Sequence, residues 1–231
     1  MSSSFGKRIV TVCFDRDSDA NWFAASELLD ELLSTNGTLV ERFRVRHLPL
    51  LGWLTRFFAY WLINASRRSG AVTAAAGGRM CRLDLDRTAA SGADRAAARW
   101  RDWHTQVAAT TPAARSWEDF LTQHQSAPDK LSEAEARRRF EHQPRVLAML
   151  AHPGDQRLDP YELGLYQAGE ATYVGFYWRA ALVGDALITT DGNLMRAASN
   201  SLADRFRFLN QACAYLGALH GSARVCALAA D

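Results

Sequence analysis

The longest regular hydrophobic pattern in the chain runs from Pro160 to His220, and it limits what the fold can be. Large or apolar residues recur there at the three- and four-residue spacing of a helix. The first set is Leu163, Tyr166, Tyr173, Phe176, Tyr177, Ala180 and Val183, and the second is Leu194, Ala198, Leu202, Phe206, Leu209, Ala212, Leu216 and Leu219. Pro160 suits the first turn of a helix and Gly221 ends the second pattern. We therefore expect the chain to end in a long antiparallel helix pair.

The link between these two patterns permits a second interpretation. Asp191-Gly192 is a strong signal for a tight type I′ turn, and Leu187–Met195 could pair around it as two strands. Residues 182–196 therefore form either a helix–turn–helix connection, which we favour, or a β-hairpin.

The start of the chain predicts a strand, a helix and a second strand. Arg8–Phe14 is rich in β-branched residues, and leucines at helical spacing follow until Asn36-Gly37 stops the pattern. Thr38–His47 alternates between apolar residues and arginines, as in a half-buried strand. We predict one α+β domain over residues 1–231, with a small βαβ-like portion at 1–70 and a mainly helical portion at 90–221.

Residues typical of helix starts divide the middle of the predicted helical portion into separate helices. Ser116 is a favourable N-cap for a short helix, and Ser132 with Glu135 resembles a capping box for the next one. Pro144 interrupts that second helix. Several short helices are therefore expected between residues 116 and 150.

The most apolar stretch is 48–65, which includes five large aromatic residues. Arg56 lies at its centre, and a charge in mid-membrane costs at least about 2.5 kcal/mol. We therefore expect no transmembrane segment. The favoured interpretation of 48–65 is a buried core helix. The alternatives are a helix that makes peripheral membrane contact and a helix that contacts a protein partner.

Composition narrows the class of protein further. The formal net charge is only +2, which does not predict a chain built as a whole to hold a polyanion. Four widely spaced cysteines form no CxxC pair, and Cys13 and Cys213 lie in apolar runs, which is typical of free thiols in a cytoplasmic protein. Six histidines show no metal-ligand spacing, and Gly77-Gly78 alone does not predict a phosphate-binding loop.

Acidic residues follow apolar stretches near both ends of the chain. Asp15 and Asp17 come after the Arg8–Phe14 strand, where two carboxylates can share a Mg²⁺ ion, and Asp185 and Asp191 follow a late apolar run. This arrangement resembles the first and last motifs of haloacid-dehalogenase-like phosphatases. The resemblance implies that Asp15 is a nucleophile, that Asp17 is a general acid and base, and that Asp185 and Asp191 bind a magnesium cofactor.

Two further groups of residues are candidates for binding. Arg42, Arg44 and Arg46 lie on one face of the predicted Thr38–His47 strand, where they could bind nucleic acid or another anion. Tyr173 and Tyr177 lie on a glycine-rich aromatic helix that could line a groove for a protein partner.

The sequence contains no complete set of catalytic residues. We therefore predict a non-catalytic binding or assembly protein with no cofactor. It would engage a protein partner, and an anionic ligand through the arginine-rich strand. The alternative is a Mg²⁺-dependent phosphohydrolase that uses Asp15 and Asp17.

Overall fold

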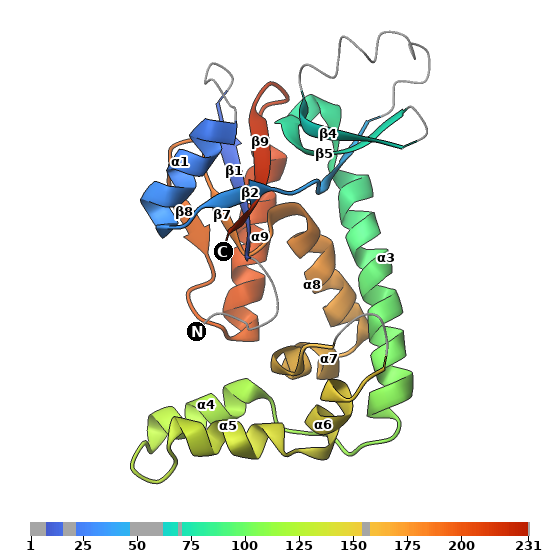
Figure 1. The fold of residues 1–231 in the computed structure, drawn as a ribbon, viewed down its shortest axis with the longest axis vertical. Helices are drawn as coiled ribbons and strands as arrows, with labels where there is room; N and C mark the ends of the chain where they lie inside the picture. The colour runs from blue at the N-terminus through green and yellow to red at the C-terminus, as the bar shows by residue number, and fades with distance from the viewer. Residues whose placement is uncertain (1–7, 16–21, 47–61, 69–70, 154–157, 231) are drawn as a thin grey trace. The chain divides into compact units, whose positions relative to one another are not determined.

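The computed structural model describes residues 8–15, 22–46, 62–68, 71–153 and 158–230 (Figure 1). The strands in this part are β1 (Arg8–Phe14), β2 (Gly37–Leu39), β3 (Phe43–Val45), β4 (Leu62–Arg68), β5 (Ala71–Arg79), β6 (Leu83–Asp84), β7 (Ala186–Ile188), β8 (Leu194–Arg196) and β9 (Arg224–Ala230). The helices are α1 (Trp22–Leu33), α3 (Leu85–Trp103), α4 (Trp117–Ser126), α5 (Glu133–Glu141), α6 (Pro144–Leu150), α7 (Leu163–Gln167), α8 (Glu170–Val183) and α9 (Leu202–Ala218). The prediction of an α+β fold is confirmed.

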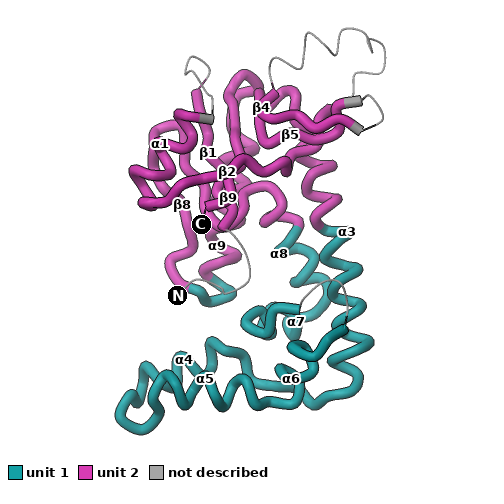
Figure 2. Tube along the Cα trace, in the orientation of Figure 1, with its two compact units in different colours: residues 1–6, 93–177, 200–203 teal, residues 7–92, 178–199, 204–231 magenta. Residues whose placement is uncertain are grey.

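The chain forms two compact units, which Figure 2 colours separately. Among the described residues, the helical unit contains 93–153, 158–177 and 200–203, and the sheet unit contains the rest. Helices α3, α8 and α9 each have residues in both units. That residues 1–231 behave as one domain stays a prediction.

The sheet unit is built on one mixed sheet. Its strand order is β6-β3-β5-β9-β1-β7-β8, with β2 paired to β9 and β4 paired to β5. β1 and β2 both run antiparallel to β9, so they are parallel to each other with β9 between them. The predicted N-terminal βαβ arrangement is therefore present in a split form.

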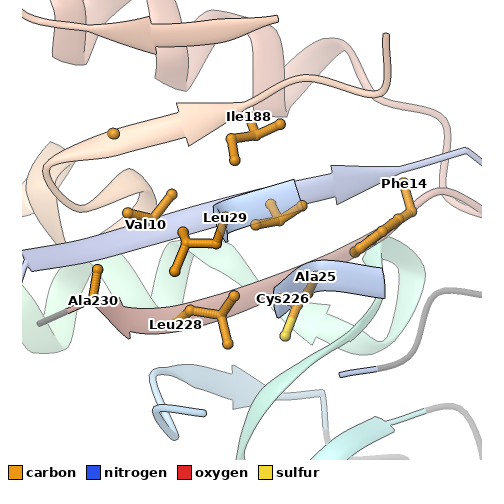
Figure 3. Close-up of a cluster of buried hydrophobic side chains, with 10 residues drawn as sticks. Val10, Phe14, Ala25, Leu29, Ile188, Cys226, Leu228 and Ala230 are labelled. Carbon is orange, nitrogen blue, oxygen red and sulfur yellow. The ribbon is translucent and has the colours of Figure 1, made fainter. Parts of the chain in front are cut away.

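Helix α1 covers one face of this sheet. Alternate residues of a strand point to the same face, and those on the α1 side of β1 and β9 are Val10, Val12, Phe14, Cys226, Leu228 and Ala230. Ala25 and Leu29 of α1 pack on them, and both side chains are 0% exposed (Figure 3). This apolar layer forms the core of the sheet unit on the α1 side.

Two glycines are required where backbones come close. A Cβ atom on Gly77 would lie 2.0 Å from the carbonyl oxygen of Val225, so only glycine lets β5 pair with β9 there. Gly184 follows α8 with a φ of +75°, and a Cβ atom on it would lie 2.4 Å from the carbonyl oxygen of Ile9. This second glycine lets the chain turn from α8 directly into β7.

The helical unit follows the predicted start signals. Ser116 caps α4 in a capping box with Asp119, Ser132 caps α5 through the backbone N–H of Glu135, and Pro144 is at the first turn of α6. Aromatic rings fill the unit, and Trp103 lies 5.1 Å from Tyr166, measured between ring centroids.

The prediction for the end of the chain needs correction. The favoured helix pair is interrupted, because β7 and β8 pair antiparallel as the β-hairpin that was the second interpretation of 182–196. The first helical pattern is divided into α7 and α8 at Gly169, whose φ is +98°. The described chain then ends on β9 and not on a helix.

The apolar stretch 48–65 is only partly described. Residues 47–61 lie outside the described residues, while residues 62–65 belong to strand β4 and not to a helix. None of the helices formed by the described residues combines the length and apolar character needed to cross a membrane.

Candidate functional site

The three arginines of the predicted strand have different environments. Arg42 is half-buried, and its guanidinium donates to the carbonyl oxygens of Ala180 and Ala181 in the last turn of α8, where a cation is favourable. Arg44 is half-buried and donates to Ser91 Oγ at 3.4 Å. Arg42 and Arg44 are therefore half-buried and donate to neighbouring helices, while anion binding by Arg42, Arg44 and Arg46 stays a prediction.

Arg46 is the exposed member of the three. Its Nε atom donates to the carbonyl oxygen of Leu83 at 3.0 Å, and its backbone N–H donates to the carbonyl oxygen of Arg82 at 2.9 Å. Only this residue keeps the solvent-facing position that the alternating pattern predicts.

Tyr173 and Tyr177 are part of the helical unit's interior. Tyr173 is 0% exposed, and its ring centroid lies 4.5 Å from that of Tyr166. Tyr177 is half-buried, and its hydroxyl donates to the Glu162 carboxylate. Burial raises the pKa of both tyrosines, so both stay protonated at neutral pH. Tyr173 cannot line an open groove for a partner, and that part of the prediction is wrong.

The acidic residues of the phosphatase resemblance do not meet at one point. Asp15 follows the carboxyl end of β1, whereas Asp185 accepts a hydrogen bond of 2.8 Å from the backbone N–H of Ile9 at the amino end of that strand. The length of β1, about 20 Å at 3.3 Å per residue, separates them. One ion therefore cannot bind both carboxylates.

The remaining residues of that motif add no ligand set. Asp191 lies in the turn of the β7–β8 hairpin, beyond the other end of β7 from Asp185, so these two also do not share an ion. Asp17 lies outside the described residues. Among the residues that the structure describes, no group of three or more His, Cys, Asp or Glu side chains could hold a metal ion.

A pair of arginines that the sequence did not single out occupies the end of the sheet beside Phe14. Arg79 is the last residue of β5 and Arg224 is the first residue of β9, and the two are directly opposite in the antiparallel register. Directly opposite residues share a face and have Cβ atoms about 5 Å apart. We call Arg79 and Arg224 the arginine pair.

The register also fixes the face on which the arginine pair lies. Arg224 is opposite Phe14 on β1, and Phe14 is part of the core under α1. Both arginines therefore project on the α1 side of the sheet, at the carboxyl end of β1, and both are half-buried. Asp15, which is exposed, follows Phe14 directly.

An exposed thiol lies close to the arginine pair. Cys81 is two residues after Arg79, and its backbone N–H donates to the carbonyl oxygen of Gly221 at 2.9 Å. By contrast, burial raises the pKa of Cys13 and of Cys226 to about 12, and that of Cys213 to about 11. Cys81 is thus the thiol that a reagent in solution reaches most easily.

Sequence reasoning missed the arginine pair because its two members are far apart in the chain. The signal that could have pointed to Arg79 is the preceding Gly77-Gly78, but Gly77 is needed for the contact between β5 and β9 and does not form a phosphate-binding loop. Arg224 begins a strand that follows the long helical pattern and that the pattern does not predict.

Comparisons with protein-family models, with curated proteins and with solved structures find no match for this chain.

Proposed function

We propose that this protein is a non-catalytic binding protein that holds a phosphate-bearing or otherwise anionic ligand at the arginine pair. The proposal keeps the anion-binding role that the sequence predicts for Arg42, Arg44 and Arg46 but assigns it to Arg79 and Arg224. A protein partner stays a prediction.

The observation that carries the proposal is the direct opposition of two like charges in the sheet. Arg79 and Arg224 are register partners on one face. An anion between two neighbouring guanidinium groups can accept hydrogen bonds from both. Arginine is well suited to this role because its planar fork matches the oxygens of phosphate and carboxylate groups.

The position of the pair in the sheet gives independent support. Ligands of α/β sheets commonly bind beyond the carboxyl ends of strands. The arginine pair lies at the carboxyl end of β1, which runs parallel to β7.

Calorimetric titration of the full chain with inorganic phosphate and with pyrophosphate, at low salt, tests this proposal. Arg79→Ala and Arg224→Ala should each weaken binding by about tenfold or more, because each removes a charge-assisted hydrogen bond worth about 1.5–3 kcal/mol. Arg196→Ala is the matched control, since Arg196 is an exposed arginine of the same unit on strand β8. It should bind like the parent.

Three outcomes would overturn the proposal. The first is that the parent chain binds neither anion, and the second is that all three arginine variants lose affinity equally. The third is Mg²⁺-dependent release of phosphate from p-nitrophenyl phosphate that Asp15→Asn abolishes, which would establish the phosphohydrolase alternative. Circular dichroism of each variant checks that the fold is retained.

A further inference from the structure

The only asparagine–glycine pair in the sequence, Asn36-Gly37, lies where the chain passes from helix α1 into strand β2. The backbone nitrogen that follows an asparagine can attack the side-chain amide of that asparagine and expel ammonia. Glycine permits this attack most readily, because it has no side chain that obstructs the approach and its backbone is the least restricted. Whether Asn36 reacts in the folded protein depends on the exposure of its side chain and on the hydrogen bonding of the Gly37 N–H group.

The N–H group of Gly37 is not used by the sheet. Val40 donates its backbone N–H to the carbonyl oxygen of Ala227 at 3.1 Å, and in an antiparallel ladder hydrogen-bonded pairs alternate with pairs that are not hydrogen-bonded. Gly37 is opposite Ala230 and lies three residues before Val40, so it belongs to a pair that is not hydrogen-bonded. Its N–H group therefore points away from β9, and no acceptor for it occurs among the described residues.

The peptide group between the two residues is also polarised for this reaction. The Asn36 side chain is exposed, and Thr35 Oγ1 donates to the backbone carbonyl oxygen of Asn36 at 3.3 Å. This carbonyl group and the Gly37 N–H group belong to one peptide unit. A hydrogen bond to its oxygen stabilises the negative charge that forms when the nitrogen loses its proton, and so favours attack by the nitrogen.

The turn of the β7–β8 hairpin provides a contrast within the same chain. Asp191-Gly192 is the only aspartate–glycine pair in the sequence and could close the same ring. There, however, the Gly192 N–H group donates to the carbonyl oxygen of Thr189 at 3.0 Å, so its nitrogen is engaged. The other described asparagines are followed by residues with side chains: Asn64 by alanine, Asn193 by leucine, Asn200 by serine and Asn210 by glutamine.

The packing of the sheet unit explains why glycine follows Asn36. A Cβ atom on Gly37 would lie 2.8 Å from Leu29 Cδ2 and 3.2 Å from Leu228 Cβ. A larger residue would push α1 and β9 away from β2, so the contact between these elements requires glycine at this position. The same glycine leaves the Asn36 side chain open to attack.

We infer that Asn36 is a site of spontaneous deamidation in the folded protein. The Gly37 nitrogen forms a bond to Cγ of Asn36, the bond from Cγ to Nδ2 breaks, and ammonia leaves with the proton that the Gly37 nitrogen gave up. The product is a five-membered succinimide ring. Water then opens the ring at either carbonyl group, which gives aspartate in one case and isoaspartate in the other.

Isoaspartate at this position changes the main chain and not only the side chain. It adds one methylene carbon to the backbone directly before β2, together with a carboxylate. Gly37 is held against Leu29 and Leu228, and β2 is only three residues long, so the strand cannot shift to absorb the added atom without losing its contacts. Isoaspartate at residue 36 therefore weakens the pairing of β2 with β9.

Mass spectrometry of the full chain, incubated folded in mildly alkaline buffer and then digested, tests the inference. The peptide that contains Asn36 should lose its side-chain amide and give two products of equal mass, aspartate and isoaspartate, which chromatography separates. Peptides with the other described asparagines should keep their amides, and the Asp191-Gly192 peptide should not isomerise. Asn36→Gln is the matched control, because it keeps an amide but would have to close a larger ring, and it should not react.

A parallel incubation in urea shows what the unfolded chain does. If Asn36 reacts in urea but stays intact in the folded protein, the fold protects it and the inference is overturned. Reaction of Asp191-Gly192 as fast as that of Asn36-Gly37 would also overturn it, because the state of the glycine N–H group would then not matter.

Amide hydrogen exchange tests the effect on the sheet. In the isoaspartate form, exchange at Val40 and at Thr38, which is opposite Ala229 in a hydrogen-bonded pair, should be faster than in the parent chain. Asn36→Asp carries the same charge on an unchanged backbone and should exchange like the parent. Equal exchange in the isoaspartate form and the parent would show that the added backbone atom does not weaken β2.

Discussion

Arg145 shows how one buried side chain can connect segments that are remote in the sequence. It is 8% exposed, and its guanidinium donates to Gln167 Oε1 at 2.7 Å, to the carbonyl oxygen of Thr111 at 2.6 Å, to Thr111 Oγ1 at 3.1 Å and to the carbonyl oxygen of Ala108 at 3.2 Å. Burial lowers the pKa of Arg145, but arginine stays charged in proteins. A single guanidinium therefore links α6 to the turn after α3 and to the end of α7.

Replacing Arg145 by methionine should destabilise the protein by about 2–4 kcal/mol. Methionine keeps an apolar stem of similar length but removes the Arg145 donors from the carbonyl oxygens of Ala108 and Thr111, whereas Gln167 Oε1 still accepts from the backbone N–H of Ala114. Buried acceptors that lose a partner are costly. Urea unfolding followed by circular dichroism measures the loss. Arg138→Met is the control, because the Arg138 side chain is 69% exposed and its ion pair with Glu135 should contribute at most about 1 kcal/mol. Equal losses in the two variants would contradict this role for Arg145.

At the scale of single helices and strands, the sequence predicts the features that depend only on neighbouring residues. Serine caps, the proline at the start of α6 and the burial of Phe43 and Val45 are set by residues close in sequence, and all are confirmed. The β7–β8 hairpin is only the second interpretation from sequence, because apolar residues at 182–196 fit both a helical and a strand period. Pairing of β7 with β1, which lies far away in the chain, is a contact that favours the strand.

The same limit explains the candidate site. Asp15 stands out in the sequence because it follows a recognisable strand, and the structure keeps it at a strand end. Arg79 and Arg224 were missed because most of the chain separates them, and only the register of β5 and β9 makes them neighbours. The arginines at 42, 44 and 46 were readable as a pattern, but α8 and α3 decide which of them face solvent.

Gly77 provides the sharpest test of the packing between two elements. Gly77→Ala should cost about 3 kcal/mol, because its Cβ would lie 2.0 Å from a backbone oxygen of β9 and the two strands would have to separate. Gly217→Ala is the matched control: Gly217 lies in α9 with nothing within 4 Å of the place that an added methyl group would take, so alanine should stabilise the helix by about 0.5 kcal/mol. The difference in urea midpoint between the two variants is the measurement. A Gly77→Ala protein as stable as the parent would show that β5 and β9 do not pair as described.

At the scale of the whole molecule, β9 connects parts of the sheet that come from both ends of the described chain. It pairs with β1 on one side and with β2 and β5 on the other, so the last described strand lies among the first. Contacts of such long sequence separation slow folding, because the intervening chain must be closed into loops before the strands can pair. The sheet unit therefore depends on residues that follow the helical part of the chain.

Leu228→Ala tests this dependence. Leu228 is 0% exposed and is opposite Val10 on β1 and Leu39 on β2, so truncation should cost about 3 kcal/mol through the lost apolar contacts and the cavity that remains. Because β1 and β2 both form their backbone hydrogen bonds with β9, amide hydrogen exchange in these two strands should accelerate together and by the same factor. Leu147→Ala, at an α6 leucine that is 49% exposed, should leave exchange in these strands unchanged. Faster exchange in β1 with β2 unaffected would mean that β9 does not join the two strands into one cooperative unit.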